Sequence, residues 1–228
     1  MDAGQSDRVG LSFEAWSLSE GVRRALDEMG YTNPTAVQQA VYQPAIDRKD
    51  IIVQSRTGTG KTAAFGIPIV EKIVRREGGL QVLVLAPTRE LALQTARELQ
   101  RLSKHLDIRT TSVYGGAPMG RQIDDLAAGA QIVSGTPGRV LDHLIRKTMD
   151  PFGLRLLVLD EMDEMLSMGF AKELNAIFER LPARRQTMCF SATVEDQARQ
   201  IAEKHMKDPV FISLSSDAIS PEEVTHYV

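Results

Sequence analysis

The sequence predicts an α/β fold, a doubly wound and mostly parallel sheet of about seven strands with helices on both faces. Short apolar runs rich in β-branched residues alternate with segments of helical character from residue 51 onward. Runs such as 82–85 (VLVL) and 156–159 (LLVL) are apolar throughout, which is typical of strands covered on both faces. Polar residues or glycines follow six of these runs, as expected where the carboxyl ends of parallel strands share one edge of a sheet.

Helices are expected before the first strand. Ser17 and Glu20 have the spacing of a capping box, which predicts a helix from there to Met29, with a glycine directly after it as the stop signal. The turn at 33–35 predicts the start of a second helix, and a separate short helix is expected over 44–48.

From residue 51 on, strands and helices alternate. Strands are expected at 51–54, 80–85, 109–113, 130–134, 155–159, 186–190 and 210–213. Helices are expected near 61–76, 88–104, 118–127, 137–146, 170–180 and 194–205. Pro68 lies within the first of these helices and is expected to kink or weaken it.

The segment 55–62 (SRTGTGKT) follows the first strand and opens a helix. A glycine-containing turn with Lys-Thr at a helix N-terminus predicts a phosphate-binding loop, because backbone N–H groups and the helix dipole favour an anion there. Lys61 would reach the terminal phosphates, and the Thr62 hydroxyl would bind Mg²⁺. Ser55 stands where the motif usually begins with glycine, so the first turn must form without one. The alternative is an ordinary strand-to-helix turn.

Asp160 and Glu161 follow the strand at 155–159 directly. A carboxylate at a strand end beside a phosphate loop holds Mg²⁺, usually through water, so Asp160 is the expected metal residue. Glu161 is placed to orient and deprotonate an attacking water. Two adjacent acids at a buried strand end are costly without compensation, which favours a functional role over a solvated turn. Asp163 and Glu164 could be solvent-facing acids at a helix N-terminus.

Composition limits the class of protein. The 228 residues, of which 43% are hydrophobic, suit one large globular domain or two small ones. The net charge of −3 argues against a generally basic nucleic-acid coat, so any nucleic-acid site must be local. The single cysteine, Cys189, excludes an internal disulfide and lies in an apolar run that favours core packing. With no span or signal peptide apparent, we expect a cytoplasmic protein, or a nuclear one in a eukaryote, and no membrane contact.

Seven short motifs, in order from residue 13 to residue 193, resemble those of the first RecA-like domain of DEAD-box ATP-dependent RNA helicases. They are similar to the Q motif (30–38, GYTNPTAVQ, with Phe13 upstream), motif I (55–62), motif Ia (87–92, PTRELA), the GG motif (115–116), motif Ib (136–139, TPGR), motif II (160–163, DEMD) and motif III (191–193, SAT). Each motif is short, but their order at these strand ends is specific.

The resemblance implies ATP and Mg²⁺ as cofactors. The amide of Gln38 can both donate to and accept from the adenine edge, and Phe13 can stack on the base. A surface-packed aromatic is the alternative for Phe13. The further nucleotide contacts implied are Tyr31, Pro34, Arg56, Thr57, Gly58, Thr59, Gly60, Lys61 and Thr62; the catalytic residues are Lys61, Asp160 and Glu161, and the metal residues are Thr62 and Asp160.

The resemblance also implies RNA as a partner, bound through its backbone without reading of its sequence. The implied RNA contacts are Pro87, Thr88, Arg89, Gly115, Gly116, Thr136, Gly138 and Arg139. The alternative for Arg89 and Arg139 is an ion pair within the domain, for example with Glu90 or Asp142. Ser191 and Thr193 are expected to hydrogen-bond Asp163 and couple the ATP site to the RNA face; capping of the next helix is compatible with this.

Two residues depart from the family pattern. Met162 replaces the alanine of Asp-Glu-Ala-Asp and is expected to find room against the core side of the sheet, with the chemistry preserved. Ser55 replaces the usual alanine or glycine of motif I, and we expect it to alter the shape of the empty loop more than its phosphate contacts.

We expect a flexible tail over 1–12, one RecA-like domain over 13–214, and a linker with the first strand of a second RecA-like domain over 215–228. That second domain would bring arginines to the ATP site, so this chain alone, as a monomer, should bind nucleotide weakly and be nearly inactive. The expected activity is RNA-stimulated ATP hydrolysis that unwinds short RNA duplexes or remodels ribonucleoprotein. The alternatives are a nucleotide-gated RNA clamp or scaffold with little hydrolysis, and a DNA helicase of the same superfamily.

Overall fold

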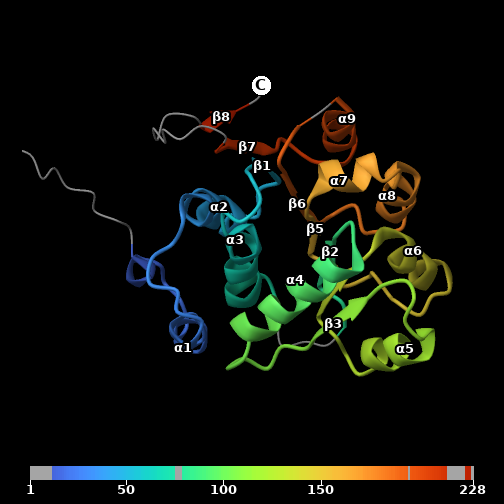
Figure 1. Cartoon of the computed structure of the whole chain (residues 1–228), viewed down its shortest axis with the longest axis horizontal. Coiled ribbons are helices and arrows are strands. Elements are labelled where there is room, and N and C mark those ends of the chain that lie inside the picture. Colours follow the sequence, from blue (N-terminus) through green and yellow to red (C-terminus); the bar gives the residue numbers. More distant parts are fainter. Residues whose placement is uncertain (1–11, 75–78, 195, 215–223, 227–228) are drawn as a thin grey trace, which may run out of the picture.

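The computed structural model describes residues 12–74, 79–194, 196–214 and 224–226 (Figure 1). The expected tail, apart from Ser12, and the expected linker up to residue 223 lie outside the described residues. The described strands form one sheet in the order β3-β4-β2-β5-β6-β1-β7-β8. They are β1 (Ile51–Gln54), β2 (Val82–Leu85), β3 (Thr110–Val113), β4 (Ile132–Gly135), β5 (Leu156–Leu159), β6 (Gln186–Ser191), β7 (Val210–Ser213) and β8 (Val224–His226).

Strands β1 to β7 are parallel to their neighbours, which confirms the doubly wound, mostly parallel fold. β8 pairs with β7 in the antiparallel direction. Residues 224–228 are predicted to begin a following domain, whereas residues 224–226 extend this sheet. Pairing there satisfies the backbone N–H and C=O groups that β7 would otherwise present as an open edge.

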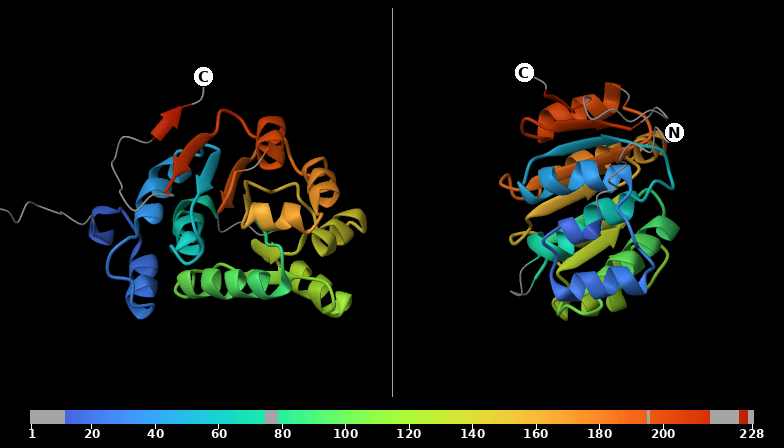
Figure 2. Two further views of the ribbon diagram at one scale, coloured as in Figure 1. Left: turned by 45° about the horizontal axis from the view of Figure 1, so that its top comes forward. Right: turned by 90° about the vertical axis from the view of Figure 1, so that its left-hand side faces the viewer.

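Helices cover both faces of the sheet (Figures 1 and 2). Apolar residues of α1 (Glu20–Glu28), α2 (Ala36–Ile46), α3 (Lys61–Pro68) and α4 (Arg89–Leu102) pack on one face. Those of α5 (Met119–Ala127), α6 (Pro137–Ile145), α7 (Met162–Ser167), α8 (Ala171–Phe178) and α9 (Asp196–His205) pack on the other. Along β2, Val82 and Val84 belong to the first core, and Leu83 and Leu85 to the second. This alternation explains why the strands are apolar throughout.

The prediction of a capping box at Ser17 is wrong, because α1 begins at Glu20 with Ser19 as its N-cap residue. The backbone N–H and the hydroxyl of Ser19 both donate to Glu71 Oε2, at 2.9 and 2.8 Å. Glu71 lies 52 residues away, so this tertiary contact, which local spacing cannot reveal, defines the start of the helix.

The helix expected after the turn at 33–35 and the short helix expected over 44–48 are one helix, α2, which continues through Pro44. Val41 and Ala45 on either side of the proline are fully buried, so core packing holds the helix together where propensity would break it. The expected effect of Pro68 is observed: α3 ends there, and the chain continues as the wider π-helical turn η2 (Ile69–Ile73). The short helix α7 was not predicted.

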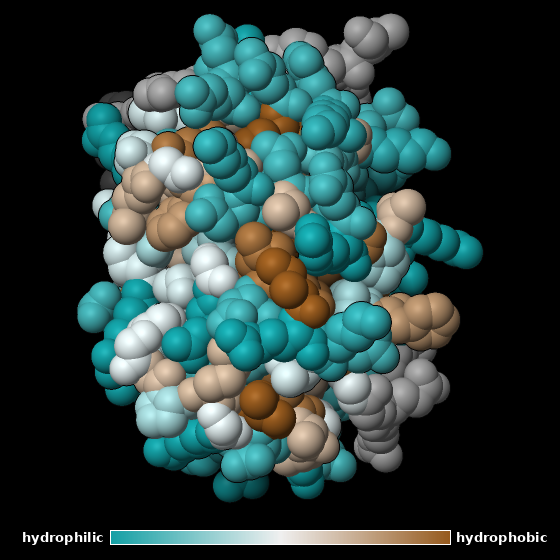
Figure 3. Space-filling model, turned by 90° about the vertical axis from the view of Figure 1, so that its right-hand side faces the viewer, coloured by the Kyte–Doolittle hydropathy of each residue, from teal (hydrophilic) through white to brown (hydrophobic). Residues whose placement is uncertain are grey.

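One face of the molecule, over the side on which α6 and α8 lie, is mostly hydrophilic with small apolar areas (Figure 3). Among the described residues the large apolar side chains most open to solvent are Ile145, Phe152 and Met168. No helix in the described ranges is long and apolar enough to cross a membrane.

Candidate nucleotide and nucleic-acid site

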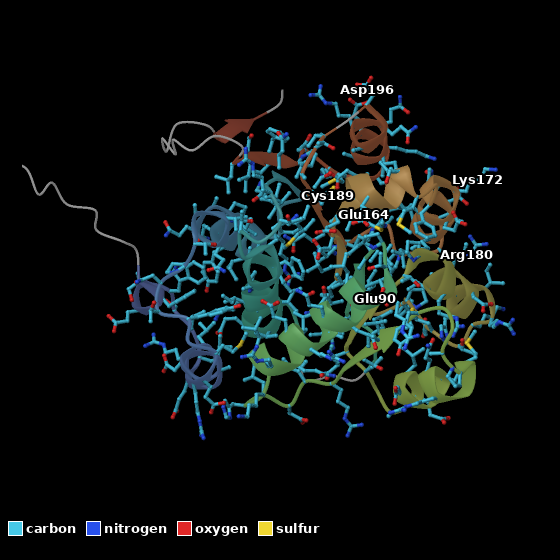
Figure 4. The ribbon with its side chains drawn as sticks, viewed as in Figure 1. Glu90, Glu164, Lys172, Arg180, Cys189 and Asp196 are labelled. Atoms are coloured by element: carbon cyan, nitrogen blue, oxygen red, sulfur yellow. The ribbon has the colours of Figure 1, made fainter. Side chains whose placement is uncertain are left out.

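The order of the strands places β6 between β1 and β5. The segments that follow these strands, 55–62, 160–163 and 191–193, therefore meet at one edge of the sheet. The backbone N–H of Ser55, after β1, donates to the Ser191 carbonyl of β6 at 2.9 Å. Asp160 and Glu161 follow β5 on the other side of β6. In Figure 4, Glu164 is labelled on α7, the helix that follows Asp160 and Glu161, and Glu90 is labelled at the start of α4.

The phosphate-binding loop contains two glycines in the left-handed region, Gly58 with φ of 79° and Gly60 with φ of 91°. Ser55 at its start is buried, and its Oγ lies 2.8 Å from Thr59 Oγ1. Thr59 in turn donates to the Arg56 carbonyl at 3.1 Å. The serine that replaces glycine therefore closes the loop through a hydroxyl pair, which a glycine could not form.

Lys61 is the first residue of α3, and its side chain is buried. Its Nζ donates to the Ser55 carbonyl at 3.4 Å, which leaves ammonium hydrogens for a phosphate group. Lys61 and Glu161 line one cavity of about 330 Å³, together with Thr57, Asp163, Glu164, Ser167 and Ala192. The predicted phosphate-binding lysine and the predicted base thus face the same space. Thr62, half-buried, is the second residue of α3.

Gln38 connects the adenine-reading segment to the phosphate loop. Its Nε2 donates to the Gly60 carbonyl at 3.3 Å, and its Oε1 accepts from the Thr35 N–H at 2.9 Å. The side chain is buried, and a Cβ on residue 60 would lie 2.7 Å from Nε2. The amide therefore positions the loop itself, a role that the sequence analysis did not assign to it.

Phe13 is buried and packs edge-to-face against Trp16, with ring centroids 5.1 Å apart. It also lines, with Tyr31, a cavity of about 450 Å³ between η1 (Phe13–Ala15), α1 and the turn after α1. The Tyr31 hydroxyl donates to Glu98 Oε1 of α4 at 3.2 Å. Pro34 is buried, and its carbonyl accepts from Gln39. The aromatic residues expected at the base thus border one cavity, while Pro34 contributes to the turn that starts α2.

Asp160 is buried, and its Oδ1 has no hydrogen-bond partner among the described residues. Burial raises the pKa of this carboxyl to about 6, although the nearby ammonium of Lys61 acts in the opposite direction. Within the residues that the structure describes, no group of three or more His, Cys, Asp or Glu side chains could hold a metal. An unpartnered carboxylate oxygen beside a phosphate loop fits Mg²⁺, which takes few protein ligands and completes its shell with phosphate oxygens and water.

Glu161 is the N-cap residue of α7 and adopts a left-handed backbone conformation, with φ of 52°. Burial raises the pKa of its carboxyl to about 7, and the neighbouring carboxyls of Glu164 and Asp160 act in the same direction. A carboxylate whose pKa lies near neutrality is suited to act as a general base. Glu164 therefore contributes to the site, a role that the sequence analysis left open.

Asp163 binds the segment 191–193 as expected. Its Oδ2 accepts from the N–H of Ala192 at 3.1 Å and from the N–H and Oγ1 of Thr193 at 3.0 and 3.2 Å. Ser191 Oγ accepts from the N–H of Asp163 at 3.3 Å and donates to the Thr193 carbonyl. Burial raises the pKa of Asp163, but these hydrogen bonds outweigh it, and the net shift is downward. The carboxylate therefore ties α7 to the end of β6.

Met162 points into the core, as predicted. It is buried, and its Sδ lies 2.9 Å from Sγ of Cys189 on β6. Cys189 is also buried, and burial raises the pKa of its thiol to about 12, so it is a core residue and not a nucleophile. The larger side chain of motif II is accommodated in the core that α5 to α9 form with the sheet.

The predicted RNA contacts follow three neighbouring strands, β3, β4 and β2. Gly115 and Gly116 are exposed after β3, and Gly138 is exposed at the start of α6, after β4. Thr136, half-buried, is the N-cap residue of α6. After β2, Pro87 is buried, Arg89 is exposed, and Thr88 caps α4 by accepting from the Leu91 N–H. The nucleotide motifs occupy β5, β6 and β1, so the two sets lie side by side along one edge.

Neither predicted RNA-binding arginine forms an ion pair within the described ranges, where Asp142 pairs with Arg146. The Arg89 guanidinium stacks over the Tyr114 ring, 4.7 Å from its centroid. Arg139 is half-buried, and its guanidinium donates to the Ala117 carbonyl at 3.0 Å. Both side chains thus attach to the loop after β3 and leave charge at the surface.

A buried amide that the sequence analysis missed supports this loop. Gln122 of α5 donates to the Tyr114 carbonyl at 3.0 Å and accepts from Arg139 at 3.1 Å and from His143 Nε2 at 3.0 Å. Because an amide oxygen only accepts, His143 carries its hydrogen on Nε2. Gln122 lies on the same helical stripe as Leu126, and a polar residue at such spacing is a signal that could have identified it.

The fold and this edge define a RecA-like P-loop NTPase domain. The chain belongs to the DEAD/DEAH box helicase family, which matches residues 35–201. It is 44% identical over 204 residues to the ATP-dependent RNA helicase CshA of Listeria monocytogenes serovar 1/2a (strain ATCC BAA-679 / EGD-e), a match that covers 90% of this chain and 39% of that protein.

Two solved structures are similar. A DEAD box protein from the hyperthermophile Methanococcus jannaschii has 37% identity and a TM-score of 0.85, covering 89% of this chain and 55% of that one. A hypothetical ATP-dependent RNA helicase from Sulfolobus tokodaii has 34% identity and a TM-score of 0.79, covering 86% of this chain and 57% of that one. The chain spans less than two thirds of each of these relatives.

Proposed function

We propose that this chain is the nucleotide-binding half of an ATP-dependent RNA helicase, which hydrolyses ATP to unwind short RNA duplexes or to remodel ribonucleoprotein. The cavity that Lys61 and Glu161 share with Asp163 is the observation that supports this most strongly, because it joins a phosphate-binding cation, a base with a pKa near neutrality and the coupling residue. A second RecA-like domain completes the site, as the partial coverage of the relatives suggests.

In this proposal the backbone N–H groups of the loop and the ammonium of Lys61 bind the terminal phosphates of ATP. Asp160 and Thr62 would hold Mg²⁺, which when bound offsets the charge of the phosphates. Glu161 orients a water and takes its proton. Asp163 transmits the state of the nucleotide to the segment 191–193, since its carboxylate holds that segment.

The RNA backbone would run along the ends of β2, β3 and β4. The N-termini of α4 and α6 present backbone N–H groups there, and Arg89 and Arg139 supply charge. These contacts give affinity without reading the sequence of the bases. The position of this surface beside the nucleotide site is what allows binding of one ligand to affect the other.

The test is ATP hydrolysis by this chain, alone and joined to the proposed second domain, with and without single- and double-stranded RNA. We expect negligible turnover by this chain alone, because arginines supplied by a second domain are worth about 10³–10⁵ in rate. In the two-domain protein, Glu161→Gln should reduce turnover by about 10²–10⁴ and preserve ATP-dependent RNA binding. Glu179→Gln, an exposed residue after α8, is the matched control.

Full RNA-stimulated turnover by this chain alone would refute the need for a second domain. Normal turnover by the Glu161→Gln protein would refute the role of the base. Negligible turnover by the unaltered two-domain protein, with ATP-dependent RNA binding retained, would favour an RNA clamp with little hydrolysis. Equal stimulation by DNA and RNA would show a helicase without preference for RNA.

A further inference from the structure

Four arginines converge on a second cavity, at the opposite end of the sheet from the nucleotide site. The cavity has a volume of about 520 Å³ and is lined by Arg48, Arg155, Arg184, Arg185 and Gln186. The four arginines lie just before β1, β5 and β6, three adjacent strands whose amino ends bring these residues to one cavity. No acid lines this cavity among the described residues.

Asp50, two residues after Arg48, already accepts hydrogen bonds from the backbone. Asp50 is buried, and its two carboxylate oxygens accept from the N–H groups of Thr187 and Lys207, each at 2.6 Å. Neither Arg48, Arg184 nor Arg185 forms an ion pair in the part of the chain that the structure describes. The charge of Asp50 acts on Arg185, so Arg48 and Arg184 are the two arginines of this cavity whose charge is offered to a ligand.

Two residues that line the cavity, Arg185 and Gln186, are held by contacts with neighbouring segments. The Arg185 guanidinium stacks over the Phe178 ring at 5.1 Å and donates to the Pro182 carbonyl at 2.6 Å, while its buried Nε has no hydrogen-bond partner among the described residues. Gln186 donates to the carbonyls of Ala45 and Lys49, at 3.2 and 2.7 Å, and so holds the segment that carries Arg48 against β6.

Arg48 occupies a conformation that favours glycine. It follows the C-terminus of α2 with φ of 59°, and its N–H donates to the Ala45 carbonyl at 3.1 Å. A side chain at such a position is strained, and a glycine would end the helix more favourably. Lys147 after α6 has the same conformation, so this backbone marks the end of a helix, and Arg48 bears on the cavity through its place in the lining.

We propose that this cavity binds a compact oligophosphate group, either free or at the end of a nucleic-acid chain. Guanidinium forks match the oxygens of phosphate in pairs, and several forks around one cavity suit a multiply charged group. A nucleic-acid backbone would instead need arginines spread along a track, because its phosphates are singly charged and spaced along the strand. The volume is within the range of small-molecule sites.

The test uses the whole chain in a Lys61→Ala background, so that the phosphate loop does not compete for the probe. Pyrophosphate is titrated while the backbone amide signals of residues 48–50 and 184–187 are followed by NMR, with affinity measured by calorimetry. We expect these signals to shift. The double variant Arg48→Gly with Arg184→Ala should weaken pyrophosphate at least about tenfold, because two charged forks are lost. Its thermal unfolding should change little, since glycine relieves the strain at position 48.

Lys147→Gly is the matched control. Lys147 is exposed, has φ of 58° and lies after α6, so this variant also removes a positive charge and a strained conformation, but away from the cavity. It should leave pyrophosphate binding unchanged. Equal weakening in the control would overturn the proposal, as would the absence of shifts at 184–187 at millimolar pyrophosphate.

Two RNAs of the same sequence, one with a 5′-triphosphate end and one with a 5′-hydroxyl end, distinguish between a nucleic-acid end and a free oligophosphate as the ligand. Tighter binding of the triphosphate form, lost in the double variant, would assign the site to a chain end. Equal binding of both RNAs, with pyrophosphate binding retained, would assign it to a free oligophosphate. A hexaglutamate peptide that binds this cavity more tightly than pyrophosphate would show an acidic protein partner instead and overturn the proposal.

Discussion

Replacing Gln122 with leucine tests how the surface predicted to bind RNA is held together. Leucine has a similar size but makes none of the three hydrogen bonds of the amide, to Tyr114, Arg139 and His143. His143 is fully buried, so its Nε2 hydrogen loses its partner without access to water. An unsatisfied buried group costs about 1–3 kcal/mol. With the Tyr114 carbonyl also unpaired, we expect a loss of about 2–5 kcal/mol in the free energy of unfolding.

Urea unfolding followed by circular dichroism measures this loss, and amide hydrogen exchange locates it. Exchange should accelerate at residues 115–117 and 139 more than in β1, since the amide joins that loop to α6. Gln43→Leu is the control, because Gln43 is exposed and bonds only to Asp47 at the surface of α2; it should change stability by less than about 0.5 kcal/mol. A loss below about 1 kcal/mol for Gln122→Leu, or unchanged exchange at 115–117, would refute the reasoning.

Two further predictions concern the same region. Burial lowers the pKa of His143, helped by the charges of Arg139 and Arg146 and opposed by Asp142; the unfolded chain therefore binds a proton near pH 6.5 that the folded chain does not, and the contribution of His143 to stability should fall as the pH drops from 7 to 5. The raised pKa values of Asp160 and Glu161 act in the opposite direction, so the prediction concerns the difference between proteins: the loss of stability of His143→Gln relative to the unaltered chain, in urea titrations, should be smaller at pH 5 than at pH 7, and an equal difference at both pH values would contradict it. Gly135→Ala would place a Cβ 2.5 Å from the Val113 carbonyl, a backbone atom that cannot easily move, so it should destabilise by about 3 kcal/mol. Gly120→Ala, where nothing lies within 4 Å of the added atom, should not, and equal melting temperatures for the two variants would contradict this account.

Much of the molecule follows from local sequence. The seven parallel strands, the phosphate loop, the acids after β5 and the inward position of Met162 could be predicted because each depends on a short motif or on the apolar character of one segment. The start of α1 after its N-cap residue Ser19 and the unbroken helix through Pro44 could not be predicted, since a distant glutamate and core packing override local preference there.

What only the tertiary structure decided is which segments become neighbours. The position of β6 between β1 and β5 brings Ser191 against both Ser55 and Asp163, although 136 residues separate the two serines in the sequence. The link from Gln38 to Gly60, the support of Arg139 by Gln122 and the meeting of four arginines at the amino ends of the strands arise in the same way. Motifs record which groups are available, but parallel strand order is set by packing between distant segments, and it is this order that assembles a site.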